Sequence, residues 1–182
     1  MSEKEKSTTK VQVRTSDDDS QLEPPKFFVW LASGVTISLI IVTQFLVRGD
    51  NPYLRGVGVF MLLLAGVFIF TPFYLLTKHG GAKEGQPYMQ TKIVVDQDLY
   101  AITRHPQYLG YMFLAGGFAW LSQHWVVILL AVVGAIFFHL QAVREERYCL
   151  AQLGEPYAQY LRRVPRFNIV LGIMRLLRGG GK

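Results

Sequence analysis

Four stretches of the chain are rich in apolar residues and contain no Asp, Glu, Lys or Arg: 27–47, 56–76, 107–121 and 125–143. The first two are each 21 residues long, and a helix of that length reaches about 30 Å, the thickness of the hydrocarbon core of a bilayer. The third is shorter, and only three residues separate it from the fourth. The pattern predicts an all-α integral membrane protein with about four transmembrane helices. The last two would form a C-terminal helical hairpin, either as two full spans or as a tighter, tilted pair.

The polar residues between and after these runs predict where the helices end. Glycines and a proline exclude a long helix in 78–90, and we expect 92–100 to be extended or irregular. The helix of the fourth run is expected to continue past residue 143 until Gly154 and Pro156 end it. The last apolar stretch, 169–177, contains an arginine and is followed by another, which is typical of an interfacial helix.

Basic residues are distributed unevenly over the two sides that four crossings would create. One side holds both termini, segment 77–104 and everything after residue 143, and it carries 17 Lys and Arg; the other carries only Arg48 and Arg55. The positive-inside rule therefore predicts that both termini are cytoplasmic. We expect residues 1–26, which mix Lys, Glu, Ser and Thr with three aspartates, to form a disordered cytoplasmic tail.

The composition of the chain limits which partners it can bind and which metal or disulfide chemistry it can support. Hydrophobic residues make up 51% of the chain and charged residues 18%, fewer charges than soluble domains carry. The net charge of +6 favours anionic lipid headgroups as partners, and no nucleic-acid partner is expected because no recognition motif accompanies it. Cys149 is the single cysteine, so neither an intramolecular disulfide nor a multi-cysteine metal site can form, and no metal site is predicted. The oligomeric state stays open.

Two charged clusters bracket the predicted hairpin, Arg104-His105 before it and Glu145-Glu146 after it. Folding the hairpin brings them to the same membrane face, where ionisable groups are costly and are kept mostly for function. Pro106 suits the first position of a helix, whose free N–H groups would face this site. The cations suit a carboxylate, and the glutamates suit an ammonium or a diol. The sequence therefore predicts a site for a zwitterionic or cationic ligand.

His139 extends this site along the hairpin. It lies seven residues before Glu146, so the two side chains share one helix face about 10 Å apart. We expect both glutamates at the cytoplasmic interface, where their replacement would leave the fold intact. Other interpretations stay open: His139 as a buried histidine bonded to a carbonyl, His105 as a helix cap, and the two glutamates as a solvated helix face beside Arg144.

Four motifs follow one another in a fixed order within residues 92–167. They are Arg104-His105-Pro106-x-Tyr108-x-Gly110, Glu145-Glu146, Leu153-Gly154-x-x-Tyr157-x-x-Tyr160 and Val164-Pro165-Arg166-Phe167. The ordered set resembles the integral membrane methyltransferases that include isoprenylcysteine carboxyl methyltransferases and phospholipid N-methyltransferases. Residues 1–91 are similar to that superfamily only in forming hydrophobic helices.

The resemblance implies a cytoplasm-facing pocket for S-adenosylmethionine and methyl transfer to a lipophilic substrate that arrives from the bilayer. Together with the residue chemistry above, it predicts cofactor contacts from Lys92, Ile93, Val94, Val95, Tyr100, Arg104, His105, Tyr108, Glu145 and Glu146. The chain then divides into the tail 1–26, two scaffold helices in 27–76, a cofactor-binding catalytic region 77–167 and an interfacial segment 168–182.

The chemistry of the transfer predicts roles for three further residues. A sulfonium donor is already activated, so the protein mainly positions the reactants and excludes water. We expect Arg144 or Arg166 to orient an anionic group of the acceptor, and His139 or Glu146 to relay the proton of an amine acceptor. Gln141 stands where prenylcysteine enzymes tend to carry a substrate-facing arginine, which disfavours a prenylcysteine acceptor. A phospholipid amine, a thiol, a carboxylate and a quinone- or terpenoid-like molecule stay open.

Two other functions fit parts of the pattern. Membrane sterol reductases have a similar C-terminal architecture but bind NADPH, whose phosphates would call for more basic pocket residues than Arg104 and Arg144. A non-enzymatic four-helix membrane scaffold would leave the order and spacing of the charged motifs unexplained. We therefore favour the methyltransferase interpretation.

Overall fold

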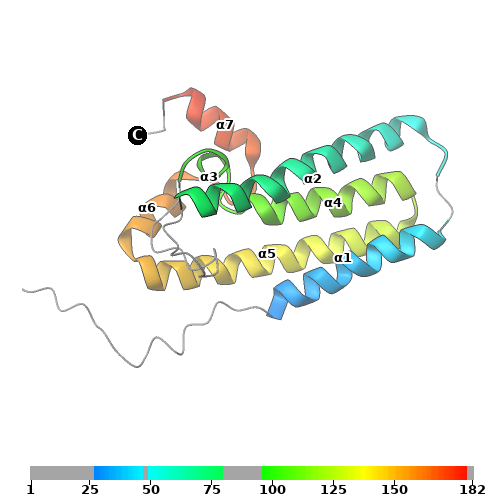
Figure 1. Ribbon diagram of the computed structural model, residues 1–182, viewed down its shortest axis with the longest axis horizontal. Coiled ribbons are helices and arrows are strands. Elements are labelled where there is room, and N and C mark those ends of the chain that lie inside the picture. The colour runs from blue at the N-terminus through cyan, green and yellow to red at the C-terminus, as the bar shows by residue number, and fades with distance from the viewer. Residues whose placement is uncertain (1–26, 47–48, 80–95, 180–182) are drawn as a thin grey trace, which may run out of the picture.

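The computed structural model describes residues 27–46, 49–79 and 96–179, and the regular structure of these residues is entirely helical (Figure 1). In chain order the helices are α1 (Phe27–Phe45), α2 (Pro52–His79), α3 (Leu99–Ile102), α4 (Pro106–Ser122), α5 (Trp125–Leu153), α6 (Glu155–Arg163) and α7 (Ile169–Leu177). The prediction of an all-α protein is confirmed for this part of the chain. The predicted tail at 1–26, most of segment 78–90 and residues Lys92 to Val95 lie outside the described residues.

Three helices are long and apolar enough to cross a membrane: α1, the Pro52–Pro72 part of α2, and α5. Helix α4 has only 17 residues, which is at the lower limit for a full span. The chain is therefore a membrane protein with three candidate spans among its described residues. Whether α4 makes a fourth crossing stays a prediction.

The segment around Tyr100 differs from the sequence-based expectation. We expected 92–100 to be extended or irregular, but Tyr100 lies in the short helix α3. A helix of four residues has little stability of its own, and Asp98 provides no side-chain cap. Tertiary contacts stabilise α3 instead: the Tyr160 hydroxyl on α6 donates to the Tyr100 carbonyl at 2.8 Å, and α7 packs against α3.

Helices α4 and α5 form the predicted hairpin, with α2 packed on α4 and α1 packed on α5 (Figure 1). Gln123 adopts a left-handed conformation (φ 52°) in the tight turn of this hairpin. Its side chain also exchanges two hydrogen bonds with the backbone of Asn51, at 3.3 and 3.0 Å. These bonds tie the start of α2 to the α4–α5 turn at one end of the bundle.

Glycines allow α2 and α4 to approach each other closely. A Cβ at Gly110 would stand 2.9 Å from the backbone nitrogen of Ile69, and a Cβ at Gly117 would stand 3.0 Å from the carbonyl oxygen of Gly58. Close backbone contact of this kind holds helices together where lipid removes the hydrophobic driving force. The contact fixes the position of α4 and therefore of the charged motif that precedes it.

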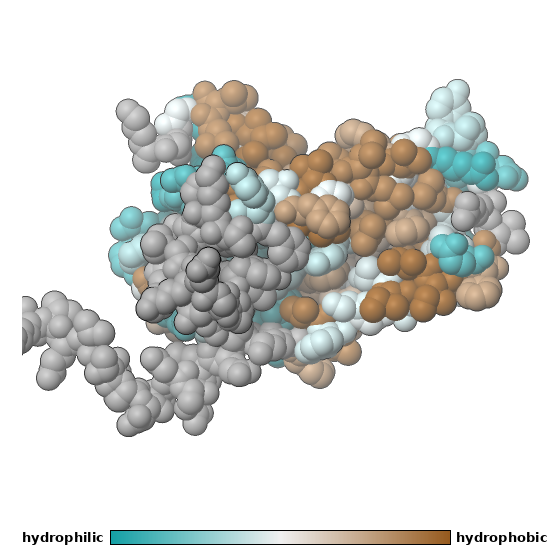
Figure 2. All heavy atoms as spheres, viewed as in Figure 1, coloured by the Kyte–Doolittle hydropathy of each residue, from teal (hydrophilic) through white to brown (hydrophobic). Residues whose placement is uncertain are grey.

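Large apolar side chains lie on the outside of the bundle, and small ones fill much of its interior. Five of the outward residues are 60–84% exposed: Trp30, Phe45, Phe60, Phe70 and Trp125. Buried positions include Ala32, Ala65, Ala115, Ala119 and Ala142. Figure 2 shows apolar residues over much of the bundle surface. An exposed apolar surface of this extent is too large for a soluble monomer but suits a lipid environment.

We predict that Gly110→Ala lowers the thermal unfolding midpoint of the detergent-solubilised protein, whereas Gly66→Ala does not. Both substitutions raise helix propensity equally, but the new methyl group at residue 110 meets the backbone of α2, and nothing lies within 4 Å of a Cβ at residue 66. Overpacking of this kind costs about 1–3 kcal/mol. Scanning fluorimetry that gives the two variants equal midpoints would contradict the close α2–α4 contact.

Candidate functional site

The charged motifs meet at the end of the bundle where α4 begins, beside α3, α6 and α7 (Figure 1). His105 directly precedes α4 with a non-helical backbone (φ −125°, ψ 65°), and Pro106 occupies the first turn. The predicted start of this helix at Pro106 is therefore confirmed. The His105 side chain is buried and does not cap the helix through a hydrogen bond.

The carboxylate of Glu146 on α5 is the centre of this cluster. Arg166 binds it through two hydrogen bonds, from Nε to Oε1 at 2.9 Å and from Nη2 to Oε2 at 2.7 Å. His105 Nε2 lies 3.1 Å from Oε1, and this nitrogen must carry the proton because an ionised carboxylate only accepts. Arg104 Nε adds an ion-pair contact at 3.4 Å. Two segments of the chain, the one before α4 and the one after α6, therefore converge on one buried carboxylate of α5.

Burial makes this convergence necessary. The Glu146 side chain is only 8% exposed, contrary to our expectation that both glutamates lie at the interface. A carboxylate withdrawn from water is stable only when it is paired and hydrogen-bonded. The two-bonded geometry with Arg166 is among the strongest available pairings. In turn, the hydrogen bonds to Glu146 raise the pKa of the Arg166 guanidinium, so this cation keeps its charge.

Backbone contacts hold the two cationic segments side by side. The amide of Arg104 donates to the carbonyl of Pro165 at 3.0 Å, and the hydroxyl of Thr103 donates to the carbonyl of Arg166 at 2.6 Å. Thr103 is fully buried. The segment before α4 and the segment after α6 are therefore one unit, which presents its cations to Glu146 together.

Glu145 differs from its neighbour in both exposure and partners. Its side chain is 24% exposed, and its Oε2 lies 3.6 Å from Nδ1 of His105, beyond hydrogen-bond distance. The imidazole of His105 is therefore flanked by two carboxylates and stacks on the ring of Tyr108, with ring centres 5.5 Å apart. The Tyr108 hydroxyl is buried beside Glu145 and Gln141, and no described residue forms a hydrogen bond of good geometry with it. Glu145 and the Tyr108 hydroxyl are therefore less tightly bound within the cluster than Glu146 is.

His139 lies on α5 two turns before Glu146 and also contacts the cluster. Its Nε2 lies 3.5 Å from Nη1 of Arg166, so it shares a partner with Glu146, as the predicted common helix face requires. Because a guanidinium only donates, a hydrogen bond here would have the imidazole nitrogen as its acceptor. His139 is exposed, which makes the interpretation as a buried structural histidine wrong.

Arg144 lies on another part of the α5 surface. Its guanidinium carbon stands 4.2 Å from the centre of the Phe28 ring on α1, a cation–π contact. The residue is exposed. Arg144 is therefore positioned beside α1, whereas Arg166 is positioned in the Glu146 cluster.

The structure brings most of the predicted site residues to the same end of the bundle. Arg104, His105, Tyr108, His139, Glu145, Glu146 and Arg166 share contacts there. Tyr100 belongs to α3 at that end, and its carbonyl is bonded to Tyr160. Lys92, Ile93, Val94 and Val95 lie outside the described residues. Contact of each residue with a cofactor stays a prediction.

Sequence reasoning assigned no role to Phe167 or Thr103. The ring of Phe167 lies 6.0 Å from the rings of both His105 and His139, so it packs between the two histidines. Its position in the Val164-Pro165-Arg166-Phe167 motif was the sequence feature that could have indicated a role. Nothing in the local pattern marks Thr103, whose importance comes from a bond to a residue 63 positions away.

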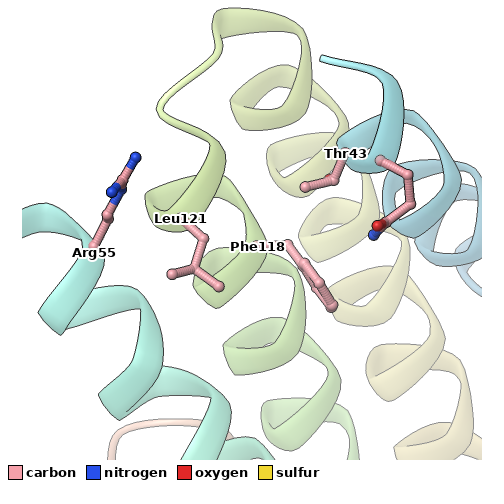
Figure 3. Close-up of a pocket in the computed structure, with 5 residues that line it drawn as sticks. Thr43, Arg55, Phe118 and Leu121 are labelled. Atoms are coloured by element: carbon pink, nitrogen blue, oxygen red, sulfur yellow. The ribbon is translucent and has the colours of Figure 1, made fainter. Parts of the chain in front are cut away.

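A pocket of about 230 Å³ lies at the other end of the bundle. Figure 3 shows it between α1, α2 and α4, and its lining consists of Thr43, Gln44, Arg55, Phe118 and Leu121. It contains none of the predicted site residues. We therefore assign it no part in the chemistry of the Glu146 cluster.

The fold and the site define a class: a helical membrane protein that gathers ionisable motif residues at one end of an apolar hairpin. The sequence model of the family described as phospholipid methyltransferase matches residues 54–155, more than half of the chain. The chain belongs to the phospholipid methyltransferase family, which confirms the superfamily resemblance. The match ends before Arg166, so one partner of Glu146 comes from outside the matched region.

A curated relative is the protein-S-isoprenylcysteine O-methyltransferase of Schizosaccharomyces pombe (strain 972 / ATCC 24843). The two chains are 34% identical over 74 residues, which are 40% of this chain and 31% of the relative. The match therefore spans about a third of the length of that curated relative. No solved structure matches the chain.

We predict that Glu146→Gln destabilises the protein strongly, whereas Glu145→Gln has little effect on stability. The first change leaves two arginines and a histidine without their shared counter-charge, and breaking a buried pair costs on the order of 3 kcal/mol. For a domain of this size, that corresponds to a thermal midpoint lower by roughly 5–10 °C.

Thermal unfolding of both variants in the same detergent provides the comparison. Glu145 is a matched control because it is the adjacent residue of the same helix, is more exposed than Glu146, and contacts His105 only at 3.6 Å. Equal shifts for the two variants would show that Glu146 is not the centre of the cluster.

Proposed function

We propose that this protein transfers a methyl group from S-adenosylmethionine to a lipophilic acceptor at the cytoplasmic face of a membrane. One observation carries the proposal: the motif residues Arg104, His105 and Glu145 gather at one end of an apolar helix bundle in a member of the phospholipid methyltransferase family. Ionisable groups are kept at such a position mainly for function.

The polar groups of the cluster fit this cofactor. Glu145 is partly exposed and its contact to His105 is long, so its carboxylate can accept from the ammonium or the ribose diol. The buried Tyr108 hydroxyl has an unused hydrogen-bonding capacity. Arg104 and His105 can hold the carboxylate of the cofactor by charge-assisted hydrogen bonds. We assign Glu146 the different task of keeping Arg104, His105 and Arg166 in place.

The remaining residues position the acceptor and exclude water. When bound, S-adenosylmethionine supplies a methyl group on an activated sulfonium, so a thiolate or carboxylate acceptor needs no base. An amine acceptor must lose a proton, and the exposed imidazole of His139 beside Arg166 is positioned to take it. Arg166 is fixed by Glu146 with Nη1 directed toward His139, where it can orient an anionic group. The exposed Arg144 offers a second cation beside α1.

The distribution of charge supports a cytoplasmic site. Segment 77–104 and the residues after 143, which contain the cluster, are rich in Lys and Arg, whereas only two basic residues lie on the opposite side of the predicted spans. By the positive-inside rule, both termini and the cluster are cytoplasmic. A lipophilic acceptor would reach the cluster along the apolar outer surface of the bundle.

Acceptors of two classes deserve direct comparison. The family description names phospholipids, and the curated relative is named for isoprenylcysteine. Gln141 stands at the position where prenylcysteine enzymes tend to carry an arginine. Its side chain is uncharged and buried, so it offers no cation to a prenylcysteine carboxylate. A phospholipid amine is the first acceptor to test, with a prenylated thiol or carboxylate as the second.

We predict that the detergent-purified protein binds S-adenosylhomocysteine with micromolar affinity by calorimetric titration and does not bind NADPH. Glu145→Gln should raise the dissociation constant about tenfold, because one charge-assisted hydrogen bond contributes about 1.5 kcal/mol. Glu155→Gln is the matched control, since Glu155 is an exposed glutamate on α6 that pairs with Arg162.

The outcomes separate the alternatives. Binding of NADPH alone would favour a reductase, and binding of neither molecule would favour a non-enzymatic scaffold. Equal effects of Glu145→Gln and Glu155→Gln would refute the assignment of Glu145. When binding is established, transfer of labelled methyl groups to phosphatidylethanolamine and to a prenylcysteine, measured side by side, identifies the acceptor class.

A further inference from the structure

Helix α7 exposes an apolar face that no other described part of the chain covers. Its outward residues, 39–82% exposed, are Val170, Leu171, Ile173, Met174 and Leu177. At 100° per residue these positions fall on about one half of the helix circumference. Contact with water over this whole face would be unfavourable.

The opposite face of α7 is attached to the protein and cannot turn to bury the apolar side. A Cβ at Gly172 would stand 2.0 Å from the carbonyl oxygen of Ile102, so the backbone of α7 rests directly on α3. Arg175 donates to the carbonyl of Ala101 at 2.5 Å. These two contacts fix the rotation of α7, and the apolar face must therefore point away from the bundle.

The charges around α7 indicate what covers it. Residues 156–179 include five arginines and no Asp or Glu. Arg162 and Arg163 are exposed but pair with Glu155 and Asp96, whereas Arg178 at the end of α7 is exposed and forms no ion pair with another described residue. A second copy of this segment would bring like charges together, whereas an anionic lipid surface would complement them.

The position of α7 agrees with a lipid surface. In Figure 1 it lies at the end of the bundle where α4 begins, beside α3. Figure 2 shows apolar residues over α7 and over the bundle surface in the same view. An apolar face and arginines on one short helix suit the boundary between headgroups and acyl chains.

We propose that α7 lies in the membrane interface on the side of the Glu146 cluster, with its apolar face among the acyl chains and Arg178 at the lipid phosphates. The partner is a leaflet that contains anionic phospholipid. Because α7 rests on α3 next to Thr103 and Arg104, this contact also anchors the segment that enters the cluster. The proposal concerns membrane contact and holds whether or not the chain transfers methyl groups.

Spin labels in nanodiscs of phosphatidylcholine and phosphatidylglycerol test the proposal on the full chain. After Cys149→Ala, single cysteines are introduced at Val170 or Leu177 on the apolar face, with Gln159, an exposed polar position on α6, as the matched control. Power saturation should show labels at 170 and 177 several-fold more accessible to oxygen than to a water-soluble nickel chelate. The label at 159 should show the reverse.

Two results would overturn the proposal. Accessibility of the 170 and 177 labels to the nickel chelate would place the face in water, and dipolar broadening between labels would show that a second copy covers it. A measurement without introduced cysteines or labels uses the unmodified chain: trypsin should cleave after Arg178 at least fivefold more slowly in anionic nanodiscs than in phosphatidylcholine nanodiscs. Equal cleavage rates would also contradict the proposal.

Discussion

The carboxylate of Glu146 is a negative charge buried away from water, and the residues around it balance that charge. Arg166 supplies two hydrogen bonds, His105 a third, and Arg104 an ion-pair contact. These cations come from the segment before α4 and the segment after α6, which are joined by their own backbone bonds. One buried charge therefore determines where α4, α5 and the C-terminal segment meet, and it leaves Glu145 for the ligand-binding role that we propose.

The second constraint is the lipid environment. Helices that face lipid gain little from hiding large apolar groups, so they associate through small residues and close backbone contact. Gly58, Gly110 and Gly117 provide that contact between α2 and α4. Gly110 lies one turn beyond Pro106, so the same packing that holds the bundle together also positions His105. The apolar exterior that results is the path by which we propose that a lipophilic acceptor reaches the cluster.

Much of the fold could be predicted because strong local signals mark it. Uncharged runs identify the long helices, Gly154 ends α5 as expected, and α7 coincides with the predicted stretch 169–177. Helix α3 could not be predicted, because it depends on a hydrogen bond from Tyr160. The motif spacing correctly indicated one cluster at one end of the hairpin. It could not tell Glu145 from Glu146, since neighbours on a helix point about 100° apart and only the packing of α5 decides which one is buried.

The central claim is that Arg166 balances the buried charge of Glu146 and that the two act as one pair, and a double-mutant cycle measures this most directly. The free energies of unfolding of Glu146→Gln, Arg166→Gln and the double variant would be compared with that of the unmodified protein under identical detergent conditions. We predict a coupling energy of about 2 kcal/mol, because removing the second partner costs little once the first is lost. Additive effects, with a coupling energy near zero, would contradict the account.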